Sequence, residues 1–67
     1  MVVIKSLKQT DIGKWVEYRG QAGEIEKGKI KSWNDTYIFV VYKCAEQWDR
    51  FKDYTGQATK PEDLFFI

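Results

Sequence analysis

The 67-residue sequence contains no histidine, which removes the side chain most often used as a general base and as a metal ligand. It has one cysteine, Cys44, so it cannot form an internal disulfide bond and its fold does not require an oxidising compartment. Without histidine and with one cysteine, a zinc site built only from protein ligands is close to excluded. We therefore expect no metal site, no cofactor and no nucleophilic role for Cys44.

Net charge and long hydrophobic runs are also scarce. A formal net charge of +1 creates no field over the whole molecule that would attract nucleic acid or an anionic membrane, so such binding would depend on a local patch. No apolar run approaches the ~20 residues of a membrane-spanning helix. Residues 1–4 are too few for the hydrophobic core of a signal peptide. We expect a soluble, cytoplasmic protein that has no membrane partner.

Aromatic residues, in contrast, are abundant, with three Trp, four Tyr and four Phe. A chain of 67 residues forms a single domain, residues 1–67, and hides only about 60% of the surface that its unfolded form exposes. Aromatic rings supply the large buried areas that such a small core needs. Their total exceeds what so small an interior can bury, so some rings should remain at the surface as contact points.

Residues 27–43 have the pattern of a β-hairpin. The first arm, 27–33, alternates polar and apolar residues, and the second arm, 36–42, is dense in β-branched and aromatic residues. Between them stand Asn34 and Asp35, whose short side chains tolerate the left-handed conformations of a tight turn. The sequence therefore predicts a hairpin with its tip near residues 34 and 35.

The register of this hairpin stays open. A two-residue turn pairs Ile30 with Phe39, whereas a three-residue turn pairs Ile30 with Val40. A shift by one residue exchanges the two faces of a strand. It therefore decides whether Tyr37 and Phe39, or Ile38 and Val40, face the core.

The other segments predict shorter elements. In chain order these are an edge strand or a terminal segment at 1–4, a turn at 10–13, a strand at 14–18 with Val16 inside, a loop at 19–26, a strand at 57–60, a turn at 61–63 and a strand at 64–67. In residues 44–55, aromatic residues recur at helical spacing, which fits a short helix, a pair of 3₁₀ turns or an ordered loop.

Short strands separated by frequent turns predict a mainly β fold, a barrel closed on itself. One strand bent across two sheets and a short helical turn before the last strand give an SH3-like arrangement. The sequence therefore predicts one small SH3-like barrel of about five strands with one short helical turn.

Four segments carry a family resemblance: Ile-Gly-Lys-Trp-Val (12–16), Gly-Lys-Ile (28–30), Ile-Phe-Val-Val-Tyr (38–42) and Pro-Glu-Asp-Leu (61–64). In this order they resemble the small SH3-like barrels of the Tudor and KOW kind. Residues 32–35 followed by 37–42 resemble small uncharacterised proteins of phage and prophage origin. The likeness covers most of the chain after residue 10 and implies a barrel fold. It is nearly silent on activity, and no aromatic cage of the Tudor type is carried over.

Four residues of the first hairpin arm are expected to share one strand face: Lys27, Lys29, Lys31 and Trp33. The simplest interpretation is a solvated face whose lysines discourage edge pairing, with Trp33 lying over the barrel end. The alternative is a ligand face. There Lys29 and Lys31 would attract phosphates, Trp33 and Tyr37 would stack on bases, and Asn34 or Asp35 would bond to base edges.

A second candidate cluster contains Trp48, Phe51 and Tyr54, interleaved with Arg50 and Lys52. Aromatic residues at helical spacing usually belong to the core. All three cannot easily be interior, however, because the chain has so much other aromatic mass to bury. A surplus aromatic residue beside Arg50 would form a contact patch of the kind enriched at interfaces, and Trp48 and Arg50 are therefore candidate binding residues.

These patterns predict a non-catalytic binding protein, since nothing in the spacing of the ten Asp and Glu residues singles out an acid–base pair. The expected ligand is a nucleotide or short nucleic acid. If the phage resemblance holds, the protein could sequester a cyclic dinucleotide, and a homodimer would then be expected. The alternative is a protein–protein interaction module or an inhibitor of a host protein.

Overall fold

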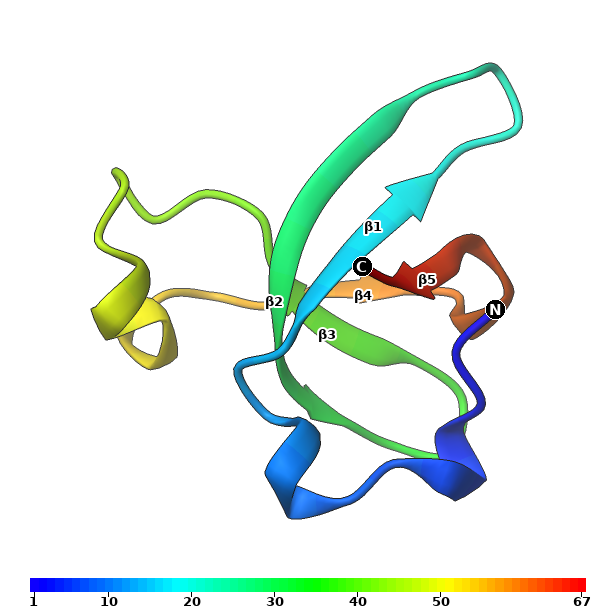
Figure 1. The fold of residues 1–67 in the computed structure, drawn as a ribbon, viewed down its shortest axis with the longest axis horizontal. Helices are drawn as coiled ribbons and strands as arrows, with labels where there is room; N and C mark the ends of the chain where they lie inside the picture. Colours follow the sequence, from blue (N-terminus) through cyan, green and yellow to red (C-terminus); the bar gives the residue numbers. More distant parts are fainter.

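The structure is a computed structural model that describes residues 1–67, and it consists of one sheet of five antiparallel strands joined by short turns (Figure 1). The strands are β1 (Trp15–Arg19), β2 (Ile25–Trp33), β3 (Ile38–Val41), β4 (Gln57–Thr59) and β5 (Leu64–Phe66). Their order across the sheet is β4-β3-β2-β1-β5. The mainly β fold class with about five strands, predicted from the sequence, is confirmed.

The long strand β2 joins the two halves of the sheet. Its residues 25–29 pair with β1, and its residues 29–33 pair with β3. β2 is strongly curved, so the two halves turn toward each other around the core (Figure 1). This is the bent strand expected from the sequence, and the resulting shape is compatible with a small barrel.

Helical structure is limited to 3₁₀ turns, and there are four of them rather than the one predicted. They are η1 (Ile4–Ser6), η2 (Gln9–Asp11), η3 (Trp48–Asp53) and η4 (Pro61–Asp63). Such turns close short connections because each backbone bond spans only three residues. η4 is the predicted turn before the last strand. η3 consists of two turns merged across a kink at Arg50, which was one of the three arrangements that the spacing allowed.

The hairpin of β2 and β3 follows neither predicted register along its whole length. Ile30 lies opposite Val40, as a three-residue turn would give, but Ser32 lies opposite Phe39 and the register shifts between Ile30 and Ser32. The extra residue is Lys31, so β2 contains a β-bulge, which inserts one unpaired residue and reverses the faces beyond it. Val40 and its strand neighbour Ile38 face the core, and both are fully buried.

The main core lies inside the curve of the sheet. Six buried residues form it: Val2, Val16, Ile30, Ile38, Val40 and Leu64. Burying a side chain of this size contributes roughly 1.5–3 kcal/mol. Residues 1–3 form no strand, so of the two predictions for this segment the terminal segment is correct. Val2 attaches it to the sheet, because its side chain is buried and its backbone N–H donates to the Leu64 carbonyl at 2.8 Å.

A second, smaller core lies on the opposite face of the sheet, beneath η3. Val41, Cys44 and Phe51 form it, with Trp48 and Tyr54 packed half-buried around them. The expectation that Trp48, Phe51 and Tyr54 could not all be interior is confirmed, since only Phe51 is buried. This cluster fixes η3 against β2 and β3.

The connections around β1 agree largely with the sequence. Gly13 has a φ of +90°, as expected for the turn before β1. The predicted loop at 19–26 is shorter, because Ile25 and Glu26 already belong to β2. A bond from the Gly20 N–H to the Glu24 carbonyl (2.8 Å) closes the loop early. No helix in the structure has the length and hydropathy needed to cross a membrane.

Candidate functional site

The hairpin tip offers less to a ligand than its sequence indicates. Trp33 lies half-buried against the main core, because the bulge turns it toward the inside. The side-chain oxygen of Asn34 accepts the backbone N–H groups of Thr36 (2.8 Å) and Tyr37 (2.7 Å). That oxygen is therefore occupied in shaping the turn. Asp35 and Tyr37 remain exposed at the tip.

The row of lysines is divided between solvent and η3. Lys29 Nζ lies 3.4 Å from the Trp48 carbonyl oxygen, and Lys31 Nζ lies 2.6 Å from the Tyr54 carbonyl oxygen. Lys27 stays exposed. The expectation that Trp33 shares a face with Lys29 and Lys31 is wrong, because the bulge directs Trp33 to the opposite side.

The structure brings together a different set of aromatic and cationic groups around Trp15. The rings of Trp15 and Trp48 lie 4.6 Å apart between centroids, with planes inclined at 57°. Lys29 Nζ lies 5.2 Å from the Trp15 ring and 5.4 Å from the Phe51 ring. Trp15 keeps 40% of its surface exposed, so its ring can be reached from solvent.

Local sequence explains how this arrangement forms. Val16 is buried inside, so strand alternation turns Trp15 outward, where its cross-strand partner is Lys29. The buried Phe51 fixes η3 on the same side and brings Trp48 onto the Trp15 ring. The carbonyl bonds of Lys29 and Lys31 strengthen this attachment, because hydrogen bonds from a charged donor are stronger than neutral ones.

Further charged residues continue this surface along β1. Arg19 Nε pairs with the Glu17 carboxylate at 3.0 Å, and its guanidinium carbon lies 4.2 Å from the Phe65 ring centroid. Lys27 is the cross-strand partner of Glu17. We call this surface the β1 outer face and define it by Trp15, Glu17, Arg19, Lys27, Lys29, Trp48 and Phe65. It carries three cationic side chains and one carboxylate, a local charge of +2.

Arg50, the remaining candidate from the sequence, forms no cation–π contact with these rings. Its guanidinium pairs with Asp53 at 3.4 Å, and both side chains are about two-thirds exposed. The sequence interpretation missed Trp15, Arg19 and Phe65. The signal was present for Trp15, since an inward Val16 already required an outward Trp15 on the same strand.

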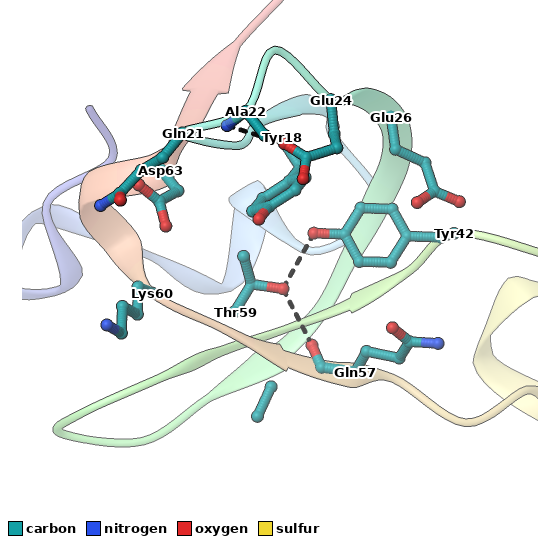
Figure 2. A pocket seen from close by; sticks show the side chains of 11 residues that line it. Tyr18, Gln21, Ala22, Glu24, Glu26, Tyr42, Gln57, Thr59, Lys60 and Asp63 are labelled. Carbon is teal, nitrogen blue, oxygen red and sulfur yellow. Dashed lines mark hydrogen bonds between the residues drawn. The ribbon is translucent and has the colours of Figure 1, made fainter.

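A hollow of about 630 Å³ lies elsewhere, between the loop after β1 and the segment from β4 to η4 (Figure 2). Its lining includes the carboxylates of Glu24, Glu26 and Asp63 and one cation, Lys60. A local charge of −2 would repel a phosphate group. Anionic ligands are therefore better suited to the β1 outer face than to this hollow.

Comparison with known proteins assigns this sequence to no family. No family model matches the sequence, and no similar protein was found among curated proteins or solved structures.

Proposed function

We propose that this chain is a non-catalytic binding module that holds a nucleotide or a short single-stranded nucleic acid on the β1 outer face. The observation that carries the proposal is the pair of indoles, Trp15 and Trp48, with Trp15 exposed beside the Lys29 ammonium group. Stacking of a base on an aromatic side chain contributes roughly 1–3 kcal/mol and tolerates any base, because every base has a π face.

The charges of this surface support the same ligand. Lys27 is exposed and has no ion-pair partner within 4 Å, so its ammonium group is free to approach a phosphate. Arg19 lies over Phe65 and pairs with Glu17, which orients its guanidinium group beside the strand. A strand of nucleotides running along β1 would meet an indole first and cationic groups next, the combination typical of single-strand binding surfaces.

The SH3-like arrangement and the phage origin belong to the same proposal. The bend of β2 and the 3₁₀ turn before β5 support the former. The surface offers one well-exposed indole, so a ligand with two bases, such as a cyclic dinucleotide, would need a second copy of the chain to cover its other base. A protein that sequesters such a ligand would therefore act as a homodimer.

The test is a titration of tryptophan fluorescence with hexathymidylate and, separately, with cyclic di-GMP. The Trp15→Ala variant should lose affinity by about five- to 150-fold, which corresponds to one lost stacking contact. Tyr37→Ala is the matched control, because Tyr37 is 38% exposed at the hairpin tip and Trp15 is 40% exposed. Equal losses in both variants would contradict the choice of surface, and a loss in Tyr37→Ala alone would move the site to the hairpin tip.

A protein partner is the second candidate, and the end of β5 favours it. Phe66 and Ile67 are 49% and 67% exposed, and the Ile67 N–H donates to the Trp15 carbonyl at 3.4 Å. These apolar side chains lie at the end of β5, which pairs with the strand β1 that carries Trp15, and they would suit an apolar partner surface. Absence of any fluorescence change with either nucleotide probe would favour this second function.

A further inference from the structure

The hollow described above has aromatic walls that are held in place before any ligand arrives. The rings of Tyr18 and Tyr42 meet edge to face, with centroids 6.3 Å apart and planes at 73°. Their hydroxyl ends point toward the same space above Thr59 (Figure 2). Both residues are half-buried and pack on the main core.

A short hydrogen-bond chain fixes Tyr42 further. The Thr59 hydroxyl donates to the Gln57 carbonyl at 3.2 Å, and the Tyr42 hydroxyl lies 2.8 Å from Thr59 Oγ1. Because Thr59 has a single hydroxyl proton, Tyr42 must be the donor in the second bond. The ring of Tyr42 therefore stands in one orientation as a wall of the hollow.

The absence of a side chain at Gly20 leaves room for the Glu24 carboxylate at the edge of the hollow. A Cβ atom at Gly20 would overlap with the Glu24 carboxylate and would lie 3.1 Å from the Tyr18 hydroxyl. The missing side chain allows Glu24 to fold back over the loop, where its carboxylate accepts the Ala22 N–H at 3.1 Å. The loop thus holds one negative charge beside the Tyr18 ring.

The other carboxylates come from different segments. Glu26 stands on β2 and Asp63 on η4, so the hollow has negative charge on several sides. Burial raises the pKa of Tyr42, and the charges of Glu26 and Asp63 raise it further. No three His, Cys, Asp or Glu side chains lie close enough together to hold a metal ion. The carboxylates surround a space rather than converge on one point.

The volume of the hollow and the chemistry of its lining together indicate the class of ligand. A volume of about 630 Å³ lies within the range of small-molecule sites, roughly 300–1,000 Å³. The Tyr18 and Tyr42 hydroxyl oxygens can accept hydrogen bonds from an ammonium or guanidinium group, and the surrounding carboxylates add ion pairing and charge-assisted hydrogen bonds. We propose that this hollow binds an organic cation that carries an alkylammonium or guanidinium group, independently of the β1 outer face.

The test is a titration of ¹⁵N-labelled protein followed by NMR, with agmatine as a free cation and an acetyl-Gly-Arg-Gly-amide peptide as a protein side chain. Saturable shifts in the backbone peaks of residues 20–26 and 59–63 are expected. Binding of the peptide alone would assign the site to a protein partner, binding of agmatine alone would assign it to a free metabolite, and both results support the proposal. The absence of saturable shifts with either probe would overturn it.

Variants distinguish binding in the hollow from a general attraction of cations to the negative charges of the protein. Glu26→Gln combined with Asp63→Asn should lower the affinity about tenfold, because two of the three carboxylates lose their charge. Glu46→Gln is the control, since Glu46 is exposed and does not line the hollow. The affinity of this variant for the cationic probe should be unchanged. Equal weakening in both variants, or the same shifts with magnesium chloride at matched ionic strength, would overturn the proposal.

Discussion

Gly28 shows at the residue scale how little free space the curved sheet leaves. A Cβ atom at this position would lie 2.5 Å from the Val41 carbonyl oxygen and 2.7 Å from Val40 Cγ1. The first of these is a backbone atom of the neighbouring strand, so it cannot move aside without disturbing the β2–β3 pairing. Gly28 is therefore required where β2 passes from β1 to β3.

Replacement of Gly28 by alanine should lower the free energy of unfolding by about 1–3 kcal/mol, the usual cost of forcing an extra carbon into a packed site. Urea denaturation measures this loss. Gly23→Asn is the control, because no atom lies within 4 Å of its Cβ position and asparagine tolerates the φ of +86° found there. A smaller loss for Gly28→Ala than for the control would show that the sheet relaxes around the added carbon.

The environment of Asp11 predicts that the stability of the fold depends on pH. A hydrogen bond from the Lys14 ammonium group (2.8 Å), together with the Lys8 N–H, holds the pKa of Asp11 below its ordinary value of 3.8. The folded state thus binds the proton more weakly than the unfolded state does. The carboxylate stabilises the fold above pH 3.8, and this contribution is lost as the pH falls through the lowered pKa.

The measurement compares Asp11→Asn with the original sequence by urea denaturation at about pH 7 and at about pH 2. The variant should be less stable at the higher pH, and the difference should shrink at the lower pH. A difference that stays constant between the two would assign the effect of Asp11 to something other than its charge.

At the scale of elements, the strands could be predicted from sequence but the bulge in β2 could not. The alternation around Val16 predicted the ends of β1 within a residue or two, and the β-branched residues of β3 did the same for that strand. Lys31, in contrast, has no glycine, proline or other local signal of an unpaired residue. Its ammonium group bonds to a carbonyl 23 residues away, so only the folded chain determines its position. The candidate site moved from Trp33 to Trp15 for this reason.

The contact between Lys31 and η3 can be measured with a matched pair of variants. Lys31→Met keeps the aliphatic stem and removes the bond to the Tyr54 carbonyl, so it should lower the free energy of unfolding by about 1.5–3 kcal/mol. Lys27→Met, on the same strand but exposed, should change it by no more than about 0.5 kcal/mol. If the two variants lose the same amount, the Lys31 bond does not hold η3 to the sheet.

At the scale of the whole molecule, a net charge of +1 conceals a separation of charge. The β1 outer face carries three cations and one carboxylate, and the hollow carries three carboxylates and one cation. The sequence alone could not reveal this separation, because the residues of each surface come from three or four distant segments. The separation of charge agrees with the two proposals, an anionic ligand on the β1 outer face and a cationic one in the hollow.

This separation predicts a modest salt dependence of nucleic-acid binding. Each neutralised phosphate of a single strand contributes about −0.7 to the slope of log affinity against log salt, so three cations give a slope of at most about −2. Lys27→Met should reduce the magnitude of this slope by about 0.7. Fluorescence titrations at several salt concentrations provide both values. A slope that Lys27→Met leaves unchanged would place the phosphates away from this surface.

The most direct measurement follows the three indole N–H peaks of the protein by ¹H–¹⁵N NMR while hexathymidylate is added. Binding on the β1 outer face should move the peaks of Trp15 and Trp48, which lie together, and leave that of Trp33, which packs against the core. Movement of the Trp33 peak alone, or saturation without movement of the Trp15 peak, would contradict the account.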